Sequence, residues 1–324
     1  MSYAFEEKTD QGIRVLQLKK GEEVVMEILP DHGGTLNVLK FEVQGKWVST
    51  IYGYESRDEV PQFPGSRSAI LFPFPNRLRK GTYKYQGIEY QFPTEEKHQG
   101  NAIHGFVRKE PFKLEHYEAN AGGGEAKIAY YYGGDRRYYP FAFGLYVTFK
   151  YFADRLETHF SVENRGNTHM PVGLGWHPYF MLNRGNVSDW EMKLPFVSHV
   201  QLDGENLPTG EVADYHDFEN FTSLADAQFD DCFKLIMQDK SALFSNADNV
   251  GLLLEHSPEF LFLQVYIPGD RQSIALEPMN CNVDAFNNQE GLMDLEKGSF
   301  FDTQFTVRLL TPEVYHEMRQ AQDS

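Results

Sequence analysis

The chain has 324 residues, 41% of them apolar, which is enough to build a full hydrophobic core. Its 47 acidic and 30 basic residues give a formal charge of −17, which disfavours nucleic acid and anionic membranes as partners and leaves a neutral small molecule as the expected ligand. Two cysteines, Cys232 and Cys281, are too few for a disulfide framework or a cysteine-based zinc site. One bridge between them stays open, and two free thiols are the simpler interpretation.

Neither a secretion signal nor a membrane span is predicted. The first ten residues carry Glu6, Glu7 and Asp10 and have no apolar stretch of the kind found in signal peptides. No run approaches the roughly 18 apolar residues that span a bilayer. We therefore expect a cytoplasmic protein.

Two segments in the first third of the chain are expected as loops that present polar side chains. In the first, two prolines precede Asn76 and Arg77, which favours a loop that carries an amide and a guanidinium. In the second, His104 follows a polar stretch and precedes Gly105. Taken alone, neither segment separates a binding site from an ordinary surface loop.

The middle of the chain alternates apolar and polar residues, as half-buried strands do. In residues 145–151 the apolar positions are Leu145, Val147, Phe149 and Tyr151, and residues 156–162 repeat the pattern. Turn-forming residues separate such runs, for example at 31–34, 120–124, 133–135 and 268–270. These segments predict strands joined by tight turns.

A third strand is predicted to end at His177, because Pro178 follows it. Within this strand His177 shares one face with Gly173 and Gly175. Two glycines leave an open floor beside the imidazole, where a ligand can approach closely. The pattern marks His177 as a candidate functional residue.

Two later segments, 261–267 and 273–279, predict strands that carry a polar group on an otherwise apolar background. In the first, Gln264 lies between two aromatic side chains, a combination that suits sugar hydroxyls and the apolar face of a pyranose. In the second, Glu277 ends a β run beside a proline, and its desolvation would raise its pKa toward the range of a general base. An exposed amide and a salt-bridged glutamate are the ordinary alternatives.

The C-terminal region predicts one more strand, Phe305–Leu309, and then a helix. Thr311 can cap this helix, and Pro312 occupies its first position before residues 314–322. Many short strands with Gly/Pro turns and little helical periodicity predict an all-β antiparallel sandwich or barrel. Because no linker-like stretch or repeat interrupts the chain, residues 1–324 are interpreted as a single domain.

The order of these segments resembles the aldose 1-epimerase (galactose mutarotase) family. The similarity runs from residues 31–34 to the last strand, and the motifs that carry it are Pro75–Leu78, Asn101–Gly105, His177–Phe180, Phe229–Phe233, Gln264–Tyr266 and Leu276–Met279 leading to Asp284–Asn287. Each motif is short, but six in this order are specific. The resemblance implies a large antiparallel β-sandwich, the galactose mutarotase-like supersandwich, with the site on its concave face.

The resemblance also implies roles for individual residues. Glu277 would take the proton of the anomeric hydroxyl as general base, His177 would protonate the ring oxygen as general acid, and His104 would hydrogen-bond the ring-oxygen side. The other sugar hydroxyls would be held by Asn76, Arg77, Asp230 and Gln264. A histidine that titrates near neutrality beside a partly desolvated glutamate suits such a pair. No cofactor and no metal is needed, because both steps are proton transfers.

A hexose-6-phosphate 1-epimerase is the nearest alternative within the superfamily. The segment His104–Arg108 resembles that enzyme, and a phosphate cradle could form from Arg77, Arg79, Lys80, Arg108 and Lys109. The charge of −17 weighs against it. The preferred aldose, and the choice between monomer and homodimer, are left open.

Two alternatives of other classes are a non-catalytic sugar sensor and a metalloenzyme. A sensor has no need for both Glu277 and His177. A metal could be held by His104, His177, Asp230 and Glu277, but the sequence has no His-x-His pair and no histidines at helical i, i+4 spacing.

Overall fold

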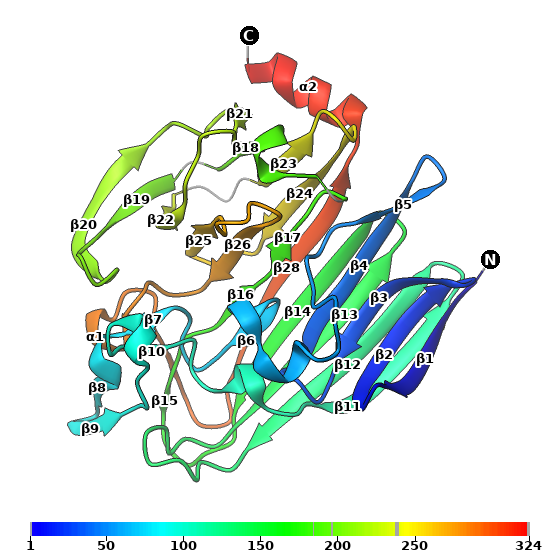
Figure 1. Cartoon of the computed structure of the whole chain (residues 1–324). Helices are drawn as coiled ribbons and strands as arrows, with labels where there is room; N and C mark the ends of the chain where they lie inside the picture. Colours follow the sequence, from blue (N-terminus) through cyan, green and yellow to red (C-terminus); the bar gives the residue numbers. More distant parts are fainter. Residues whose placement is uncertain (1, 184, 196, 237–239, 323–324) are drawn as a thin grey trace.

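The computed structural model describes residues 2–183, 185–195, 197–236 and 240–322. Antiparallel strands dominate it, and two large sheets form its main layers (Figure 1). This confirms the predicted all-β antiparallel sandwich. The alternating segments are strands whose apolar positions are buried, with burial strictly alternating along residues 155–164.

The first large sheet has nine strands and contains the alternating segments predicted for the middle and end of the chain. Its order is β11 (Lys113–Asn120), β12 (Gly123–Tyr132), β13 (Phe143–Phe152), β14 (Arg155–Asn164), β28 (Phe300–Leu310), β24 (Val250–His256), β23 (Ser241–Ser245), β18 (Trp190–Lys193) and β21 (Thr222–Ser223). Neighbouring strands pair antiparallel, and β14 pairs β28 although residues 165–299 lie between them in the sequence. Only tertiary packing brings such strands together.

The second large sheet has eight strands and carries most of the candidate site. Its order is β20 (Pro208–Tyr215), β19 (Val197–Leu202), β22 (Asp230–Leu235), β25 (Phe262–Tyr266), β26 (Ile274–Met279), β16 (Gly175–His177) and β6 (Ala69–Leu71), with β17 (Tyr179–Phe180) also paired to β26. Strand β16 ends at His177, as predicted. Strand β26 continues through Pro278, so Glu277 lies inside a strand and not at its end.

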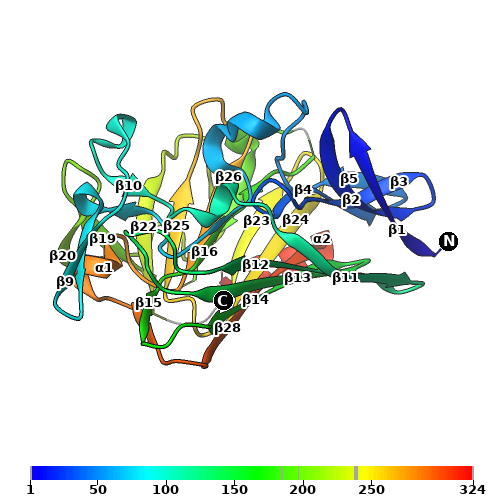
Figure 2. The same ribbon diagram turned by 90° about the horizontal axis from the view of Figure 1, so that it is seen from below.

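A five-stranded N-terminal sheet adjoins the sandwich, and β1 lies beside β11 (Figures 1 and 2). Its strands are β1 (Tyr3–Asp10), β2 (Ile13–Lys20), β3 (Glu23–Leu29), β4 (Thr35–Val43) and β5 (Lys46–Ser49). Three strand pairs complete the β-structure: β7 (Arg77–Leu78) with β10 (Ala102–Ile103), β8 (Thr82–Tyr85) with β9 (Ile88–Gln91), and β15 (Met170–Val172) with β27 (Met293–Leu295).

The helices of the described residues are short. The predicted C-terminal helix is α2 (Pro312–Gln322), and the others are α1 (Ala285–Asn288) and the 3-10 helices η1 (Val60–Gln62), η2 (Pro64–Ser66), η3 (Arg79–Gly81), η4 (Glu96–His98), η5 (Val107–Lys109) and η6 (Val187–Asp189). None of the helices in the described ranges has the length and apolar character needed to cross a bilayer.

Apolar side chains from the two large sheets meet in one core. Trp176 of β16 packs against Phe160 of β14 and Phe305 of β28, with ring centroids 6.3 and 5.7 Å apart. Because Trp176 points into this core, its strand neighbours Gly175 and His177 face the opposite side of the sheet. Cys232 and Cys281 are both buried free thiols, as the simpler interpretation predicted.

Candidate active site

A cavity of about 280 Å3 opens on the face of the eight-stranded sheet that lies away from this core. Strands β16, β17, β22, β25 and β26 form its floor, and loops from the first 109 residues complete its wall. It is lined by all seven residues expected at the site: Asn76, Arg77, His104, His177, Asp230, Gln264 and Glu277. The structure therefore brings together side chains that are up to about 200 positions apart in the sequence.

Glu277 and His177 face each other at the floor of this cavity. The carboxylate Oε1 lies 3.2 Å from the imidazole Nε2. Both side chains are buried, with residue exposures of 2% and 6%. The second carboxylate oxygen, Oε2, and the imidazole Nδ1 have no hydrogen-bond partner among the described residues. Because buried polar atoms are normally paired, these two atoms mark the place where a polar ligand would complete the site.

Burial controls the protonation of this pair. It raises the pKa of Glu277 well above its usual value, and the nearby carboxylate of Asp230 raises it further. Burial also lowers the pKa of His177 to about 3. The expectation that this histidine titrates near neutrality is therefore wrong, because desolvation disfavours the charged imidazolium and the positive charge of Arg108 lowers the pKa further. Both shifts favour a neutral carboxyl group and a neutral imidazole in the free protein.

His104 is oriented by the loop that carries Asn76. Its Nδ1 accepts a hydrogen bond from the backbone N–H of Asn76 at 3.2 Å. The neutral imidazole therefore carries its proton on Nε2, which is available as a donor to a ligand. Burial and the positive charge of Arg108 keep the pKa of His104 well below its usual value. The ring meets His177 edge-on, with centroids 5.3 Å apart.

The other four expected residues form a hydrogen-bonded arc along one side of the cavity. Arg77 Nη1 donates to Asn76 Oδ1 at 3.2 Å, and Asn76 Nδ2 donates to Gln264 Oε1 at 3.0 Å. Gln264 Nε2 in turn donates to Asp230 Oδ1 at 3.1 Å. Gln264 lies directly opposite Glu277 on the neighbouring strand. The arc fixes each donor and acceptor before any ligand arrives, which lowers the entropic cost of binding.

The loops of the site have a backbone conformation that ordinary residues avoid. Asn76 and His104 have φ values of 53° and 60°, in the left-handed region. The two segments hold each other there, because the backbone N–H of His104 donates to the carbonyl of Asn76 at 2.8 Å. Such strained residues persist only where the surrounding structure supports them, and they gather at functional sites.

Sequence reasoning missed other lining residues. Tyr179 stacks on His177 with centroids 4.8 Å apart and planes at 14°. The sequence could have indicated Tyr179, because residues 177 and 179 lie two positions apart and point to the same face of an extended chain. Ser66, Lys97 and His98 also line the cavity. They lie in the 3-10 helices η2 and η4, which are too short to give a periodic signal in the sequence.

The basic cradle considered for a phosphate is only partly assembled. Arg77, Arg108 and Lys109 line the cavity, but Arg79 and Lys80 do not. Arg79 is paired with Asp203 at 3.2 Å, and Lys80 is paired with Glu205 at 3.3 Å. These two cations belong to a surface contact with the loop after β19, which the sequence could not reveal.

The described residues give no support to the metal site considered from the sequence. No three His, Cys, Asp or Glu side chains in the described part of the chain are grouped as a metal ion requires. The ligand set drawn from the sequence has two of its members, Glu277 and His177, in contact with each other.

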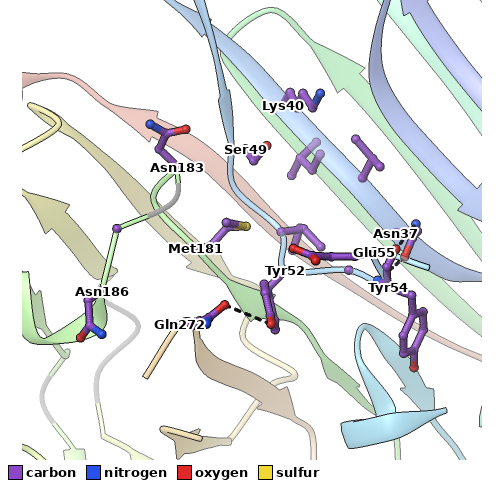
Figure 3. Close-up of a pocket in the computed structure, with 15 residues that line it drawn as sticks. Asn37, Lys40, Ser49, Tyr52, Tyr54, Glu55, Met181, Asn183, Asn186 and Gln272 are labelled. Carbon is purple, nitrogen blue, oxygen red and sulfur yellow. Dashed lines mark hydrogen bonds between the residues drawn. The ribbon is translucent and has the colours of Figure 1, made fainter. Parts of the chain in front are cut away.

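A second cavity of about 530 Å3 lies beside β4 and β5. Figure 3 shows its polar side chains, among them Tyr52, whose hydroxyl donates to Gln272 Oε1 at 3.3 Å. Its charged lining side chains are Glu55 and Lys40, and Lys40 is paired with Glu23 at 2.6 Å. Its described lining residues include no histidine beside a carboxylate. The smaller cavity has such a pair in Glu277 and His177.

Comparison with known proteins identifies the family. The sequence profile of aldose 1-epimerase matches residues 14–308. The chain belongs to the aldose 1-epimerase family. This confirms the resemblance that the six motifs carried.

Three similar proteins share between 19% and 31% sequence identity with this chain. The uncharacterized protein YihR of Escherichia coli is 31% identical over 237 residues, which are 71% of this chain and 74% of that protein. Human galactose mutarotase is 25% identical over 185 residues, which are 56% of this chain and 52% of its own length. A galactose mutarotase-like protein from Clostridium acetobutylicum has a TM-score of 0.85 at 19% identity, covering 96% of this chain and 99% of its own. The high TM-score shows that this chain and the Clostridium protein have the same fold.

Proposed function

We propose that this member of the aldose 1-epimerase family interconverts the α and β anomers of a hexose by opening and reclosing the sugar ring. One observation carries the proposal: Glu277 and His177 lie 3.2 Å apart, each with one unpartnered buried atom, in a cavity of about 280 Å3. Ring opening of a hemiacetal requires a base for the anomeric hydroxyl and an acid for the ring oxygen, and this cavity holds both side by side.

The ring-opening step needs the ionised form of the pair. The Glu277 carboxylate accepts the proton of the O1 hydroxyl while the His177 imidazolium donates its proton to the ring oxygen O5. The C1–O5 bond breaks, its electron pair stays on O5, and C1=O forms. Rotation about C1–C2 and the reverse proton transfers give the other anomer.

The Glu277–His177 pair holds the same number of protons during this step as in the free protein. After ring opening, the carboxyl is protonated and the imidazole is neutral, which is the form that burial favours without substrate. The ionised form differs only by one proton moved across a 3.2 Å contact. Arg77 favours that form, because its charge lowers the pKa of Glu277. His104 offers Nε2–H to the charge that develops on the ring-oxygen side.

The test is anomer interconversion measured by polarimetry and by exchange NMR. Glu277→Gln keeps the side-chain shape but removes the base, and we expect a rate loss of about 10²–10⁴-fold. Glu118→Gln makes the same change on an exposed strand residue and serves as the matched control. If wild type and Glu277→Gln were equally slow while both still bound sugar, the chain would be a binding protein and the proposal would be wrong.

A further inference from the structure

Part of the wall of the site cavity is a single loop, residues 53–68, which we call the wall loop. Four of its residues line the cavity: Gln62, Phe63, Gly65 and Ser66. The structure describes the whole loop, and apart from the 3-10 helices η1 and η2 it contains no helix or strand. Because it has no regular backbone pairing of its own, contacts with other parts of the chain must hold it in place.

Both ends of the wall loop are fastened to the backbone around His177. Tyr52, the residue before the loop, donates its backbone N–H to the carbonyl of Tyr179 at 2.8 Å. Ser68, the last residue of the loop, donates its backbone N–H to the carbonyl of His177 at 2.8 Å. These two bonds fix where the loop leaves and returns, so its middle needs a separate anchor.

The middle of the wall loop is anchored to the N-terminal sheet by a buried ion pair. Arg57 Nη1 and Nη2 each donate to the carboxylate of Glu27 in β3 at 2.8 Å, and Arg57 Nε donates to Asp10 at 2.9 Å. Glu27 is 2% exposed, and it also accepts hydrogen bonds from Gln17 at 2.6 Å and from Asn37 at 2.9 Å. Two parallel bonds from one guanidinium fix the direction of the contact as well as its distance.

This ion pair keeps a charge on a buried carboxylate. Burial alone would raise the pKa of Glu27, but hydrogen bonds, the strongest from Arg57, outweigh burial and the pKa is lowered. Replacing a buried ion pair with apolar residues of similar volume is often neutral for stability, because both charges lose their hydration. A directional contact with the loop is what the pair adds beyond apolar packing.

An amide beside the carboxylate makes a second connection. Asn37 of β4 donates to Glu27, and its Oδ1 accepts the backbone N–H of Tyr54 at 2.7 Å. Gly53 is pressed against the same strand, since a Cβ there would lie 2.0 Å from the carbonyl oxygen of Asn37. Asn37 and Glu27 therefore tie two points of the wall loop, Tyr54 and Arg57, to one sheet.

We propose that Glu27 and Arg57 are positioning residues for this site: through them the N-terminal sheet holds the wall loop where it can contact a bound sugar. The inference rests on the proposed function, because it takes the ligand of the cavity to be a sugar. Neither residue lines the cavity, so both act through the loop. Loss of the pair should weaken sugar binding more than proton transfer, since Glu277 and His177 belong to the eight-stranded sheet.

The first variant is Arg57→Met, which keeps an unbranched side chain and removes its donors. Calorimetry with D-glucose and D-galactose gives Kd, and anomer interconversion of the same sugars gives kcat and KM. We expect Kd and KM to rise about tenfold, the order of one or two hydrogen bonds lost between the wall and the sugar. The value of kcat should stay within about threefold of wild type, because uniform binding and not the reacting pair is impaired.

A double variant separates the position of the loop from the charge. Arg57→Met alone leaves the Glu27 carboxylate buried without its cation, which is strongly destabilising. Adding Glu27→Gln removes this charge, and the new amide can still accept a hydrogen bond from Gln17 or Asn37. The urea midpoint should therefore recover, while Kd should stay raised because the fork to the loop is still missing. A pair with a purely structural role would let affinity recover together with stability.

Arg14→Met is the matched control. Arg14 lies in β2 of the same sheet, and its ion-pair partners, Glu7 at 2.7 Å and Asp31 at 3.5 Å, are outside the wall loop. This variant should leave Kd and KM unchanged. If Arg57→Met binds sugar as tightly as Arg14→Met does, or if the double variant recovers affinity as well as stability, the inference is wrong.

The two proposals fail in different ways. If wild type binds sugar without interconverting its anomers, the epimerase proposal is wrong, and a raised Kd in Arg57→Met and in the double variant still supports the positioning role. If anomers are interconverted and neither variant changes Kd or KM, the positioning role is wrong and the epimerase proposal stands. If wild type binds neither sugar, both proposals are wrong.

Discussion

At the scale of single residues, Glu277 is costly to the fold. A carboxyl group that is 2% exposed and has one unpartnered oxygen loses its hydration without full replacement. The fold tolerates it by keeping it protonated, which links stability to pH. For a carboxyl with a raised pKa in the folded state, the unfolded chain releases its proton first, so stability falls as pH rises above the unfolded value.

Glu277→Gln should therefore stabilise the protein, and more so at higher pH. The unfolded glutamate ionises near pH 4.3, while the folded one stays protonated well above that value. Across this window the wild type loses up to about 1.4 kcal/mol of unfolding free energy for each pH unit relative to the variant. Urea unfolding at pH 5, 6, 7 and 8 measures the difference.

The control is Glu118→Gln, because Glu118 is exposed and the same substitution there should give a difference that is independent of pH. His177 contributes its own pH dependence, since its lowered pKa costs stability as pH falls below about 6.5. That contribution is present in wild type and variant alike. A constant difference between Glu277→Gln and wild type from pH 5 to 8 would show that the carboxyl is not buried as described.

The sequence predicted best which residues line the site. Glycines beside His177, aromatic residues beside Gln264 and a lone acid in an apolar strand identified candidates that do line one cavity. Their proton affinities could not be predicted, because the burial that sets them comes partly from loops far away in the sequence. The lining residues Lys97 and His98 were not predicted, because the short 3-10 helix that carries them gives no pattern in the sequence.

At the scale of elements, the site depends on a contact between two loops. The residue after His104 is Gly105, with φ of +60°, and a Cβ there would lie 2.0 Å from the carbonyl oxygen of Phe72. The same two residues form an isolated parallel bridge. The sequence predicted loops here, but it could not predict that they would brace each other, because left-handed Asn76 and His104 leave no pattern.

Gly105→Ala should therefore impair catalysis while the sandwich remains folded. The methyl group cannot fit against a backbone carbonyl, so the loop must move and His104 moves with it. A displacement of about 1 Å at a catalytic group costs roughly 10²-fold in rate. Anomer exchange measures the rate, and far-UV circular dichroism reports the fold.

Gly87→Ala is the matched control for this prediction. Gly87 also has positive φ, at +81°, but a Cβ there meets nothing within 4 Å. It should show only the cost of a left-handed alanine, about 1 kcal/mol of stability, with the rate unchanged. Equal rates for both alanine variants would mean that the Phe72 contact does not position His104.

At the scale of the whole molecule, alternation of apolar residues predicted the fold class but not the strand order. Period 2 fixes which face of a strand is buried, and that suffices for a sandwich. It does not specify which strands pair, and β14 and β28 pair although residues 165–299 separate them. The single-domain organisation of residues 1–324 stays a prediction, although one apolar cluster includes residues from Tyr3 to Val307.

The three tryptophans allow that prediction to be tested, because each lies in a different sheet. Trp47 is in β5 of the five-stranded sheet, Trp176 is in β16 of the eight-stranded sheet, and Trp190 is in β18 of the nine-stranded sheet. Three variants that each keep one tryptophan and replace the others with phenylalanine report on each sheet separately. If the shared core makes one cooperative unit, fluorescence and circular dichroism should give the same urea midpoint within each variant. Comparing the two signals in the same protein removes the stability cost of the substitutions themselves. A Trp47 signal that unfolds before the circular dichroism transition would instead show that the N-terminal sheet is a separate folding unit, and that the site cavity is formed by the remaining sheets alone.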